Sequence, residues 1–459
     1  MLVIIQFIER PTAEKVITLD DNKTEILSPR WIIPVVPRDT VLTDNSLVMK
    51  SSYIHAILPR KEALDRFPSA KETILEDQVM VPGFINTHGH AAMTLLRGLA
   101  DDRDMMDWLT NWIWPIEDKL VDEKFVYDGT RLAVLEMIQS GTTCASDLYF
   151  FPEMAAKAIT EMNFRAQVTL PVLKADNAWA KGEDEHIRKG LAFRDTVKHN
   201  ALVTTAFAPH SPYSVTNQGF EKIGIYAEQL DMPIHLHLHE TLQECEESVR
   251  DHGVRPIARM KSLGILSARL QAVHMTQLRD NEIDLVAEHG VQIAHCPESN
   301  LKLASGFCRL TDLRRAGLTV ALGTDGAASN NDLDMIQEAR SANMTAKAFS
   351  GSAINLSAIE TLEMMTIEGA RLLGLEPYIG SLEPGKLADI TCIDLSHTAF
   401  QPIYNPVSQL IYIATGRDVS HVWINGRQLL KQGKPVDLDI QGIKAAATKW
   451  QNNIKRALL

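Results

Sequence analysis

Hydrophobic positions between about residues 81 and 330 follow two alternating patterns. Short, nearly continuous apolar runs are typical of buried strands, and the segments between most of them, such as DGTRLAVLEMIQS, have helical spacing. The eight strand candidates are residues 80–86, 142–149, 165–172, 202–210, 233–240, 270–276, 291–299 and 319–326. Eight strand–helix units in succession predict an α/β fold, a (β/α)8 barrel of the TIM type.

A doubly wound open sheet is the alternative arrangement of such units. Sheets of that kind often carry a glycine-rich phosphate loop after a strand, and neither G-x-G-x-x-G nor a P-loop follows a strand here. The unusual polar residues collect instead at the carboxyl ends of many strands, where barrel enzymes place their active sites. This distribution favours the barrel.

The two flanks of the chain have a different pattern. Residues 29–80 contain short strand-like runs broken by Pro and Ser, and residues 381–430 contain GKLADITCIDL and HVWINGRQLL. Asn425 and Gly426 in the second segment predict a hairpin turn. We therefore expect the two flanks to meet as a small β-sandwich beside the barrel.

Three parts are expected in all: a composite β-domain, a catalytic barrel and a C-terminal surface helix. Their bounds are residues 1–80 with 381–440, residues 81–380, and residues 441–459. The opening stretch MLVIIQFIERP is too short for the apolar core of a signal peptide and has no leading positive cluster. We expect it to be an extension or an edge strand.

Composition narrows the range of partners. The formal net charge of −12 argues against nucleic acid and against anionic membranes, which both require a basic surface. The sequence contains no run of about 18 apolar residues, so no membrane span is predicted. The five cysteines are scattered, odd in number and without C-x-x-C spacing, which favours the cytoplasm. A small molecule is the expected partner.

Histidines and one aspartate end several of the predicted strands. His88 and His90 close VMVPGFINTHGH, and His237 lies within MPIHLHLHE. Asp325 closes LTVALGTDG. Three imidazoles and a carboxylate suit a single divalent metal such as zinc. A site of this kind usually makes hydroxide from water near neutral pH.

Each of these residues also has an ordinary structural interpretation. An H-x-H pair is often incidental, although residues two apart in a strand point the same way and can reach one ion. Periodicity does not say which histidine of HLHLHE binds a metal: His235 suits a hydrogen-bonded core position, and His239 could be a wall residue. Asp325 before a glycine suits a helix N-cap or an Asx turn. Asp325 is favoured as a metal ligand only because histidines end neighbouring predicted strands.

Further polar residues end other predicted strands. Glu240 lies at the tip of the HLHLHE strand, where strand twist can bring it into a pocket. His274 ends AVHMT and could be a fifth ligand or could orient a hydroxide. His210 and His295 could contact substrate or support the ligands, and for His295 a packed core histidine fits equally well.

Together these motifs resemble the amidohydrolase superfamily, and specifically its 5′-methylthioadenosine/S-adenosylhomocysteine deaminase branch. The resemblance covers nearly the whole chain and is carried by PGFINTHGHAAMTLLRGLADD, WLTNWIWPIED, APHSPYS, HLHLHET, HCPESNLKLASG and LGTDGAASNNDLDM. It implies one divalent metal, zinc before iron or manganese. The implied ligands are His88, His90, His237 and Asp325. Binuclear relatives use a lysine on strand four, and LVTTAFAPH contains none.

The same resemblance implies hydrolytic deamination of an adenosine-type nucleoside to its inosine form and ammonia. The metal lowers the pKa of a water, and Asp325 accepts a proton from it. His274 holds the hydroxide in line with the ring, and Glu240 protonates the ring nitrogen N1.

The resemblance also implies substrate contacts. Glu117 accepts hydrogen bonds from the two ribose hydroxyls, Trp108 walls the pocket and His210 reaches the purine. From the residues alone, Trp108 and Glu117 would suit a partly buried amphipathic helix. Some members of this branch bind the carboxylate of S-adenosylhomocysteine with arginine side chains. At the positions where such an arginine could lie, this chain has Leu170 and Pro171. The lack of an arginine at these positions ranks methylthioadenosine above S-adenosylhomocysteine as the expected substrate.

Two other functions stay open at this point. One is a related hydrolase acting on guanine, cytosine or a triazine ring. Glu117 distinguishes this function from a nucleoside deaminase, because a free base offers no diol for Glu117 to bind. The other is an inactive barrel used as an assembly scaffold, but such proteins typically lose ligands and all four are present. We also expect a homo-oligomer, either a dimer or a tetramer.

Overall fold

The structure, a computed structural model, describes residues 24–458. The extension or edge strand expected from MLVIIQFIERP lies outside the described residues.

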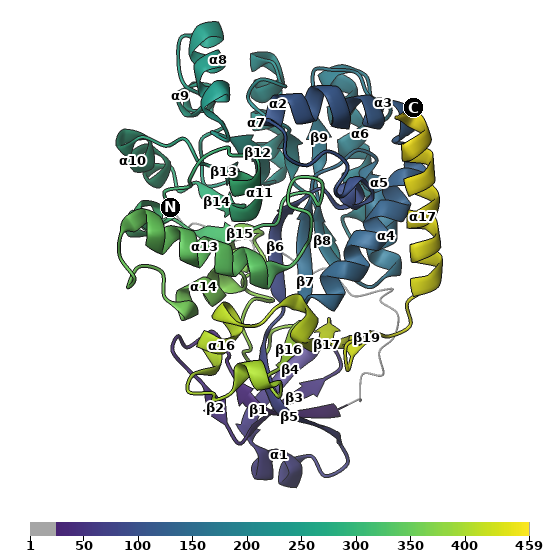
Figure 1. The fold of residues 1–459 in the computed structure, drawn as a ribbon, viewed down its shortest axis with the longest axis vertical. Coiled ribbons are helices and arrows are strands. Elements are labelled where there is room, and N and C mark those ends of the chain that lie inside the picture. Colours follow the sequence, from purple (N-terminus) through teal and green to yellow (C-terminus); the bar gives the residue numbers. More distant parts are fainter. Residues whose placement is uncertain (1–23, 459) are drawn as a thin grey trace, which may run out of the picture.

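Strands from both flanks of the chain form one nine-stranded sheet, in the lower half of Figure 1. Its order is β19-β18-β17-β16-β5-β1-β3-β4, with β2 paired to β1. The bounds are β1 Thr24–Ile32, β2 Leu42–Thr43, β3 Asn45–Lys50, β4 Tyr53–Pro59, β5 Lys71–Pro82, β16 Ile390–Asp394, β17 Val419–Ile424, β18 Arg427–Lys431 and β19 Lys434–Pro435. The flanks meet where β5 and β16 pair antiparallel. Within the described residues they build this one sheet, so the second sheet of a β-sandwich is not confirmed.

The strands between the flanks are parallel and form two sheets. One has the order β10-β8-β7-β6, and the other β15-β14-β13-β12-β11-β9. The bounds are β6 Phe84–Gly89, β7 Thr142–Asp147, β8 Arg165–Val168, β9 Leu170–Val172, β10 Val203–Thr204, β11 Phe207–Pro209, β12 Ile234–Leu238, β13 Leu270–His274, β14 Gln292–His295 and β15 Val320–Leu322. The third and fourth predicted strands are each divided between the two sheets. The fold is therefore α/β with parallel strands in the predicted chain order, but in the described chain their ladders do not make one closed sheet.

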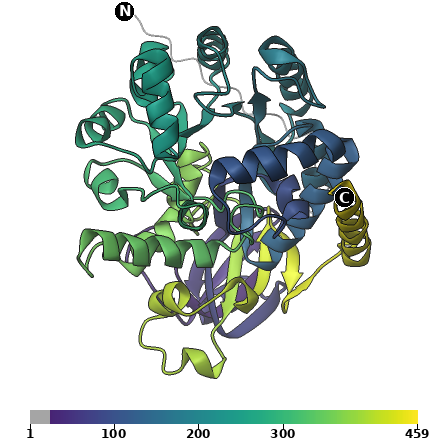
Figure 2. The same ribbon diagram turned by 45° about the horizontal axis from the view of Figure 1, so that its top comes forward.

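Helices lie around the outside of the parallel strands (Figure 2). Their bounds are α1 Arg60–Arg66, η1 Ala91–Leu96, α2 Met105–Trp108, η2 Leu109–Ile113, α3 Trp114–Leu120, α4 Glu123–Gln139, α5 Pro152–Glu161, α6 Gly182–Val197, α7 Asn217–Leu230, α8 Leu242–His252, α9 Pro256–Ser262, α10 Asp280–Glu288, α11 Pro297–Lys302, α12 Leu310–Arg315, α13 Met335–Ser350, α14 Ala358–Met364, α15 Ile367–Leu372, η3 Thr398–Phe400, α16 Pro406–Tyr412, η4 Gly416–Asp418 and α17 Ile440–Ala457. Helix α17 packs on α4, where the Trp450 indole donates to Asp128 at 2.9 Å. Between residues 24 and 458, no helix has the length and apolar character needed to cross a membrane.

One predicted strand is divided where the chain passes from the nine-stranded sheet to the parallel strands. Residues 80–86 were expected to be continuous, but β5 ends at Pro82 and β6 begins at Phe84. Gly83 joins them, and its N–H donates to the Asp389 carbonyl at 2.9 Å. A Cβ on Gly83 would come within 2.1 Å of the Thr143 hydroxyl oxygen. Only glycine allows the chain to pass this close.

The hairpin predicted from an Asn-Gly pair is confirmed. Asn425 and Gly426 join β17 to β18, and their φ angles are 52° and 75°. Positive φ at both central residues is the conformation that this type of hairpin turn requires.

Candidate active site

The carboxyl ends of the parallel strands bring the predicted ligands together. His88 lies 3.1 Å from His237, measured between the two Nε2 atoms. Oδ1 of Asp325 lies 3.3 Å from Nε2 of His88 and 3.2 Å from Nε2 of His90. His274 joins them, because it has a ring nitrogen within 4.8 Å of nitrogens of His88 and His237. Residues from four separate strand ends thus share one centre.

A chain of hydrogen bonds determines which nitrogen of His88 faces this centre. The side-chain amide of Gln271 donates to the Leu372 carbonyl at 2.7 Å, so its oxygen accepts from Nδ1 of His235 at 3.0 Å. Nε2 of His235 then carries no hydrogen and accepts from Nδ1 of His88 at 2.8 Å. Nε2 of His88 is left with a bare lone pair. The buried, hydrogen-bonded position predicted for His235 is confirmed.

His90 and His237 are held in the same tautomer. Nδ1 of His90 donates to the Leu148 carbonyl at 2.6 Å, and Nδ1 of His237 donates to the His210 carbonyl at 2.5 Å. Each Nε2 is therefore turned toward the centre and offers a lone pair whenever its ring is neutral. Burial, together with the neighbouring histidines, holds the pKa of His237 well below its ordinary value. Bare nitrogens this close repel one another unless a cation lies between them, so the donor set fits one divalent ion.

The carboxylate of Asp325 is oriented by its own surroundings. The hydroxyls of Ser299 and Ser329 donate to Oδ2 at 2.6 and 3.0 Å. The Gly326 N–H donates to Oδ1 at 2.8 Å. Asp325 therefore accepts the N–H of the next residue and also presents Oδ1 to the histidines, and among the described contacts it makes neither the N-cap nor the Asx-turn bond considered for it.

This centre opens into a cavity of about 480 Å³, within the size range of small-molecule sites. The predicted site residues that line it are His90, Trp108, Glu117, His210, His237, Glu240, His274 and Asp325. The segment α2–η2–α3 contributes an apolar side to the cavity, made by Met105, Leu109 and Ile113. The remaining predicted ligand, His88, is fully buried against His237 and Asp325.

Glu240 lines the same cavity, beside His274. Its Oε1 lies 3.8 Å from Nε2 of His274. Nδ1 of His274 in turn lies 2.8 Å from the side-chain oxygen of Asn300. Burial raises the pKa of Glu240 and the charge of Asp325 adds to this, against the opposing effect of His274. The carboxyl group therefore stays protonated closer to neutral pH than an ordinary glutamate.

Glu117 reaches the cavity from α3. The Tyr149 hydroxyl donates to its Oε1 at 2.6 Å. Burial raises the pKa of Glu117 to about 7, and burial keeps the pKa of Tyr149 well above its ordinary value. Tyr149 was missed in the sequence, although it is the last residue of a predicted strand and the rule that found the histidines applies to it.

Two of the histidines considered above lie elsewhere. His239 does not line the cavity: its Nε2 accepts the Ile257 N–H at 3.1 Å, so its ring supports backbone. His295 borders a separate small cavity of about 10 Å³, and burial lowers its pKa to about 3. His295 is packed, as the core interpretation expects, but its buried Nδ1 has no hydrogen-bond partner among the described residues, so the ring is not a fully satisfied core histidine.

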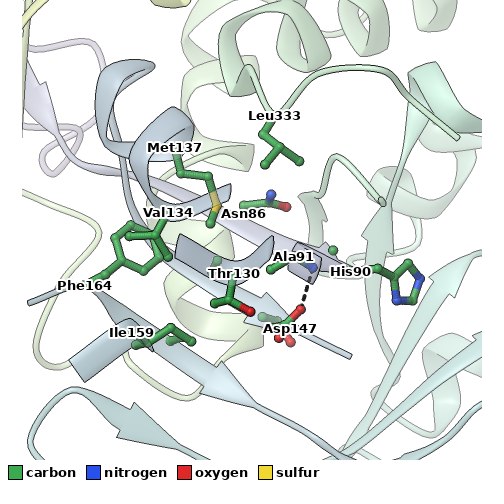
Figure 3. Close-up of a pocket in the computed structure, with 14 residues that line it drawn as sticks. Asn86, His90, Ala91, Thr130, Val134, Met137, Asp147, Ile159, Phe164 and Leu333 are labelled. Carbon is green, nitrogen blue, oxygen red and sulfur yellow. Dashed lines mark hydrogen bonds between the residues drawn. The ribbon is translucent and has the colours of Figure 1, made fainter. Parts of the chain in front are cut away.

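A further small cavity of about 20 Å³ borders His90 on the side of β7 and β8 (Figure 3). Asp147 lies at its edge and accepts the Ala91 N–H at 2.7 Å. Figure 3 shows the His90 ring pointing away from the other side chains of this cavity. Because Ala91 follows His90 directly, Asp147 anchors the backbone that carries this ring.

Comparison with known proteins agrees with this arrangement. The amidohydrolase family pattern matches residues 79–429, which include the whole of the centre described above. The chain is a member of the amidohydrolase family. The amidohydrolase resemblance inferred from the motifs is therefore confirmed.

Relatives of this amidohydrolase match it over nearly its whole length. The 5-methylthioadenosine/S-adenosylhomocysteine deaminase of Teredinibacter turnerae is 45% identical over 428 residues, covering 93% of this chain and 97% of the relative. The protein of the same name from Saccharophagus degradans is 43% identical over 437 residues, covering 95% and 98%. The crystal structure of an adenosine deaminase from Xanthomonas campestris with bound zinc has a TM-score of 0.93 and 44% identity, covering 95% and 99%.

Proposed function

We propose that this amidohydrolase is a metal-dependent deaminase that converts 5′-modified adenosines, methylthioadenosine first, to their inosine forms and ammonia. The observation that carries the proposal is the convergence of three Nε2 atoms and Oδ1 of Asp325 at a cavity that is also lined by Glu240. The names of the relatives from Teredinibacter turnerae and Saccharophagus degradans support the substrate class. S-adenosylhomocysteine, adenosine and 5′-deoxyadenosine are further candidates.

The proposed ligands of one divalent ion are His88, His90, His237 and Asp325. Zinc is the proposed ion, which the zinc-bound Xanthomonas campestris enzyme supports, and sites of this kind also accept iron or manganese. When bound, such an ion makes water acidic enough to act as a nucleophile near neutral pH.

In this proposal the catalytic steps belong to three side chains. Asp325 accepts a proton from the attacking water through the oxygen that faces the histidines. His274, held by Asn300, orients that water through Nε2. Glu240 donates its proton to N1 of the purine, where it stays in the inosine product, and this makes C6 electrophilic. The proton that Asp325 took from the water passes to the leaving ammonia, and the proton of the new C6 hydroxyl returns to Glu240 as the carbonyl forms.

Substrate recognition is proposed for the residues that line the rest of the cavity. Glu117 accepts hydrogen bonds from the ribose 2′ and 3′ hydroxyls while Tyr149 holds one of its oxygens. Trp108 walls the pocket and His210 contacts the purine. The apolar side formed by the α2–η2–α3 segment suits a methylthio group.

The architecture and setting of the enzyme complete the proposal. We propose that the parallel strands close as a (β/α)8 barrel of residues 81–380, beside a composite β-domain of residues 1–80 and 381–440 and a helix of residues 441–459. A hydrogen bond of 3.0 Å from the Asp325 N–H to the His88 carbonyl supports closure. A cytoplasmic homo-oligomer, a dimer or tetramer with a small-molecule substrate, is also proposed, and the five free cysteines support this compartment.

Ammonia release tests the function. Purified protein is given adenosine, methylthioadenosine, S-adenosylhomocysteine or 5′-deoxyadenosine before chelation, after chelation and after zinc is restored. We expect methylthioadenosine to react fastest, the chelated protein to be inactive and zinc to restore turnover. No ammonia from any nucleoside at full metal occupancy would contradict the proposal. Turnover of guanine, cytosine or a triazine alone would support the alternative of a free-ring hydrolase.

A further inference from the structure

Glu244 lies on the first turn of α8, four residues after Glu240, and its side chain is buried. Its Oε1 accepts the backbone N–H of His239 at 3.0 Å, and its Oε2 accepts the N–H of Glu240 at 2.8 Å. Thr241 caps α8 by accepting the Glu244 N–H at 3.1 Å. Both oxygens of one buried carboxylate are thus occupied by two consecutive amides at the tip of β12.

The backbone held in this way has an unusual conformation. His239 has a φ of 53°, in the left-handed region, which is unfavourable for an L-residue. In an unbroken strand, His237 and Glu240 would point to opposite faces because they are three residues apart. Both nevertheless line the same cavity. The left-handed residue between them is what redirects Glu240 into that cavity.

A purely stabilising role suits Glu244 poorly. Burial raises the pKa of Glu244 to about 8, and the charge of Glu240 contributes to this rise. Two acids buried side by side lower the stability of a fold, because burial and the neighbouring charge both disfavour the ionised form. Glu244 holds the strained turn that carries Glu240. The position of Glu244 therefore affects the direction in which the Glu240 side chain points.

We propose that Glu244 is a positioning residue, which directs the Glu240 carboxyl at the reacting ring by clamping the His239 and Glu240 amides. The inference rests on the proposed function, in which Glu240 is the proton donor. It concerns a residue that makes no contact with the metal ligands in the arrangement described above. Its effect on the reaction is therefore expected to pass through the backbone of His239 and Glu240, which sets the direction of the Glu240 side chain.

The test is a double-mutant cycle read as kcat, KM and bound metal on methylthioadenosine. Glu244→Ala removes both acceptors, and we expect kcat to fall about 10- to 100-fold, as for a catalytic group displaced by roughly 1 Å. KM and zinc content should stay as in the wild type. Glu244→Gln keeps one acceptor oxygen and should lose less. Glu246→Gln, an exposed position on the same helix, is the matched control and should behave as wild type.

The second side of the cycle separates positioning from general support of the fold. In a Glu240→Gln background the proton donor is already absent, so adding Glu244→Ala should lower kcat little further. Equal losses in both backgrounds, a loss of zinc, or an unchanged kcat in Glu244→Ala would each overturn the inference.

Two further outcomes keep the test decisive. If Glu244→Ala does not fold, as judged by thermal unfolding, the same cycle is run with Glu244→Gln and the same criteria apply. If the zinc-loaded wild type releases no ammonia from any nucleoside, the proposed function fails. An active wild type with additive losses overturns only the role of Glu244.

Discussion

At the scale of single residues, the charge of Glu117 decides what it can bind. An ionised carboxylate accepts hydrogen bonds from both hydroxyls of a cis-diol, whereas a protonated acid has lost part of that capacity. Burial raises the pKa of Glu117 to about 7 from an ordinary 4.5, and a bound cation would lower it again. KM for methylthioadenosine should therefore rise as pH falls through the range between these two values, as initial rates across pH would measure.

Replacing Glu117 by Gln tests the same contact. Hydrogen bonds to a charged group contribute about 1.5–3 kcal/mol, so KM for a nucleoside should rise roughly 10- to 100-fold. The dependence of KM on pH should flatten, because the amide does not titrate in this range. Free adenine is the control substrate and should be affected little. Unchanged nucleoside kinetics in Glu117→Gln would remove the ribose contact from the proposal.

Single residues also show what the sequence could and could not predict. The convergence of His88, His237 and Asp325 follows from strand order, because the carboxyl ends of parallel strands meet at one edge. Glu244 lies outside this rule, and Tyr149 satisfies it as the last residue of a predicted strand but has a role that the rule does not reveal. Their roles depend on the partner that another segment brings, such as a carboxylate from α3 or a left-handed turn, and periodicity does not encode that partner.

At the scale of elements, two neighbouring hairpin turns form a matched pair. Gly426 follows Asn425 between β17 and β18, and Gly433 follows Gln432 between β18 and β19, all four with positive φ. A Cβ on Gly426 would lie 2.2 Å from the Ser51 carbonyl oxygen, whereas Gly433 has open space around it. Gly433→Ala should therefore cost only the left-handed penalty, about 1–2 kcal/mol. Gly426→Ala should cost about 1–3 kcal/mol more through overpacking.

Urea unfolding midpoints of both variants measure this difference in stability. Equal losses would mean that the turn between β3 and β4, which contains Ser51, moves aside without cost. The close approach also shows a limit of sequence reasoning about elements. The Asn-Gly pair predicted the hairpin correctly, but no local signal placed Ser51 against Gly426.

At the scale of the whole molecule, a buried ion pair ties the parallel strands to the nine-stranded sheet. Arg165 begins β8 and Asp389 precedes β16, with Nε and Oδ2 2.9 Å apart and Nη2 and Oδ1 3.3 Å apart. Asp389 also accepts the Asn425 N–H at 2.7 Å, and Arg165 donates to the Ala201 carbonyl at 3.2 Å. The two partners are 224 positions apart, so strand patterns predicted both elements but not the pair between them.

Removing one partner of this pair leaves the other charge buried. Arg165→Met and Asp389→Leu should each lower the free energy of unfolding by about 3–5 kcal/mol. The double variant should lose less than the sum, because no unpaired charge remains, and the difference is the coupling energy measured by denaturant unfolding. Arg165 lies at the start of its strand and neither partner lines the cavity, so kcat/KM of the folded variants should stay as in the wild type. Fully additive losses would mean that the two parts of the molecule are held together by their apolar contacts, with the ion pair contributing nothing of its own.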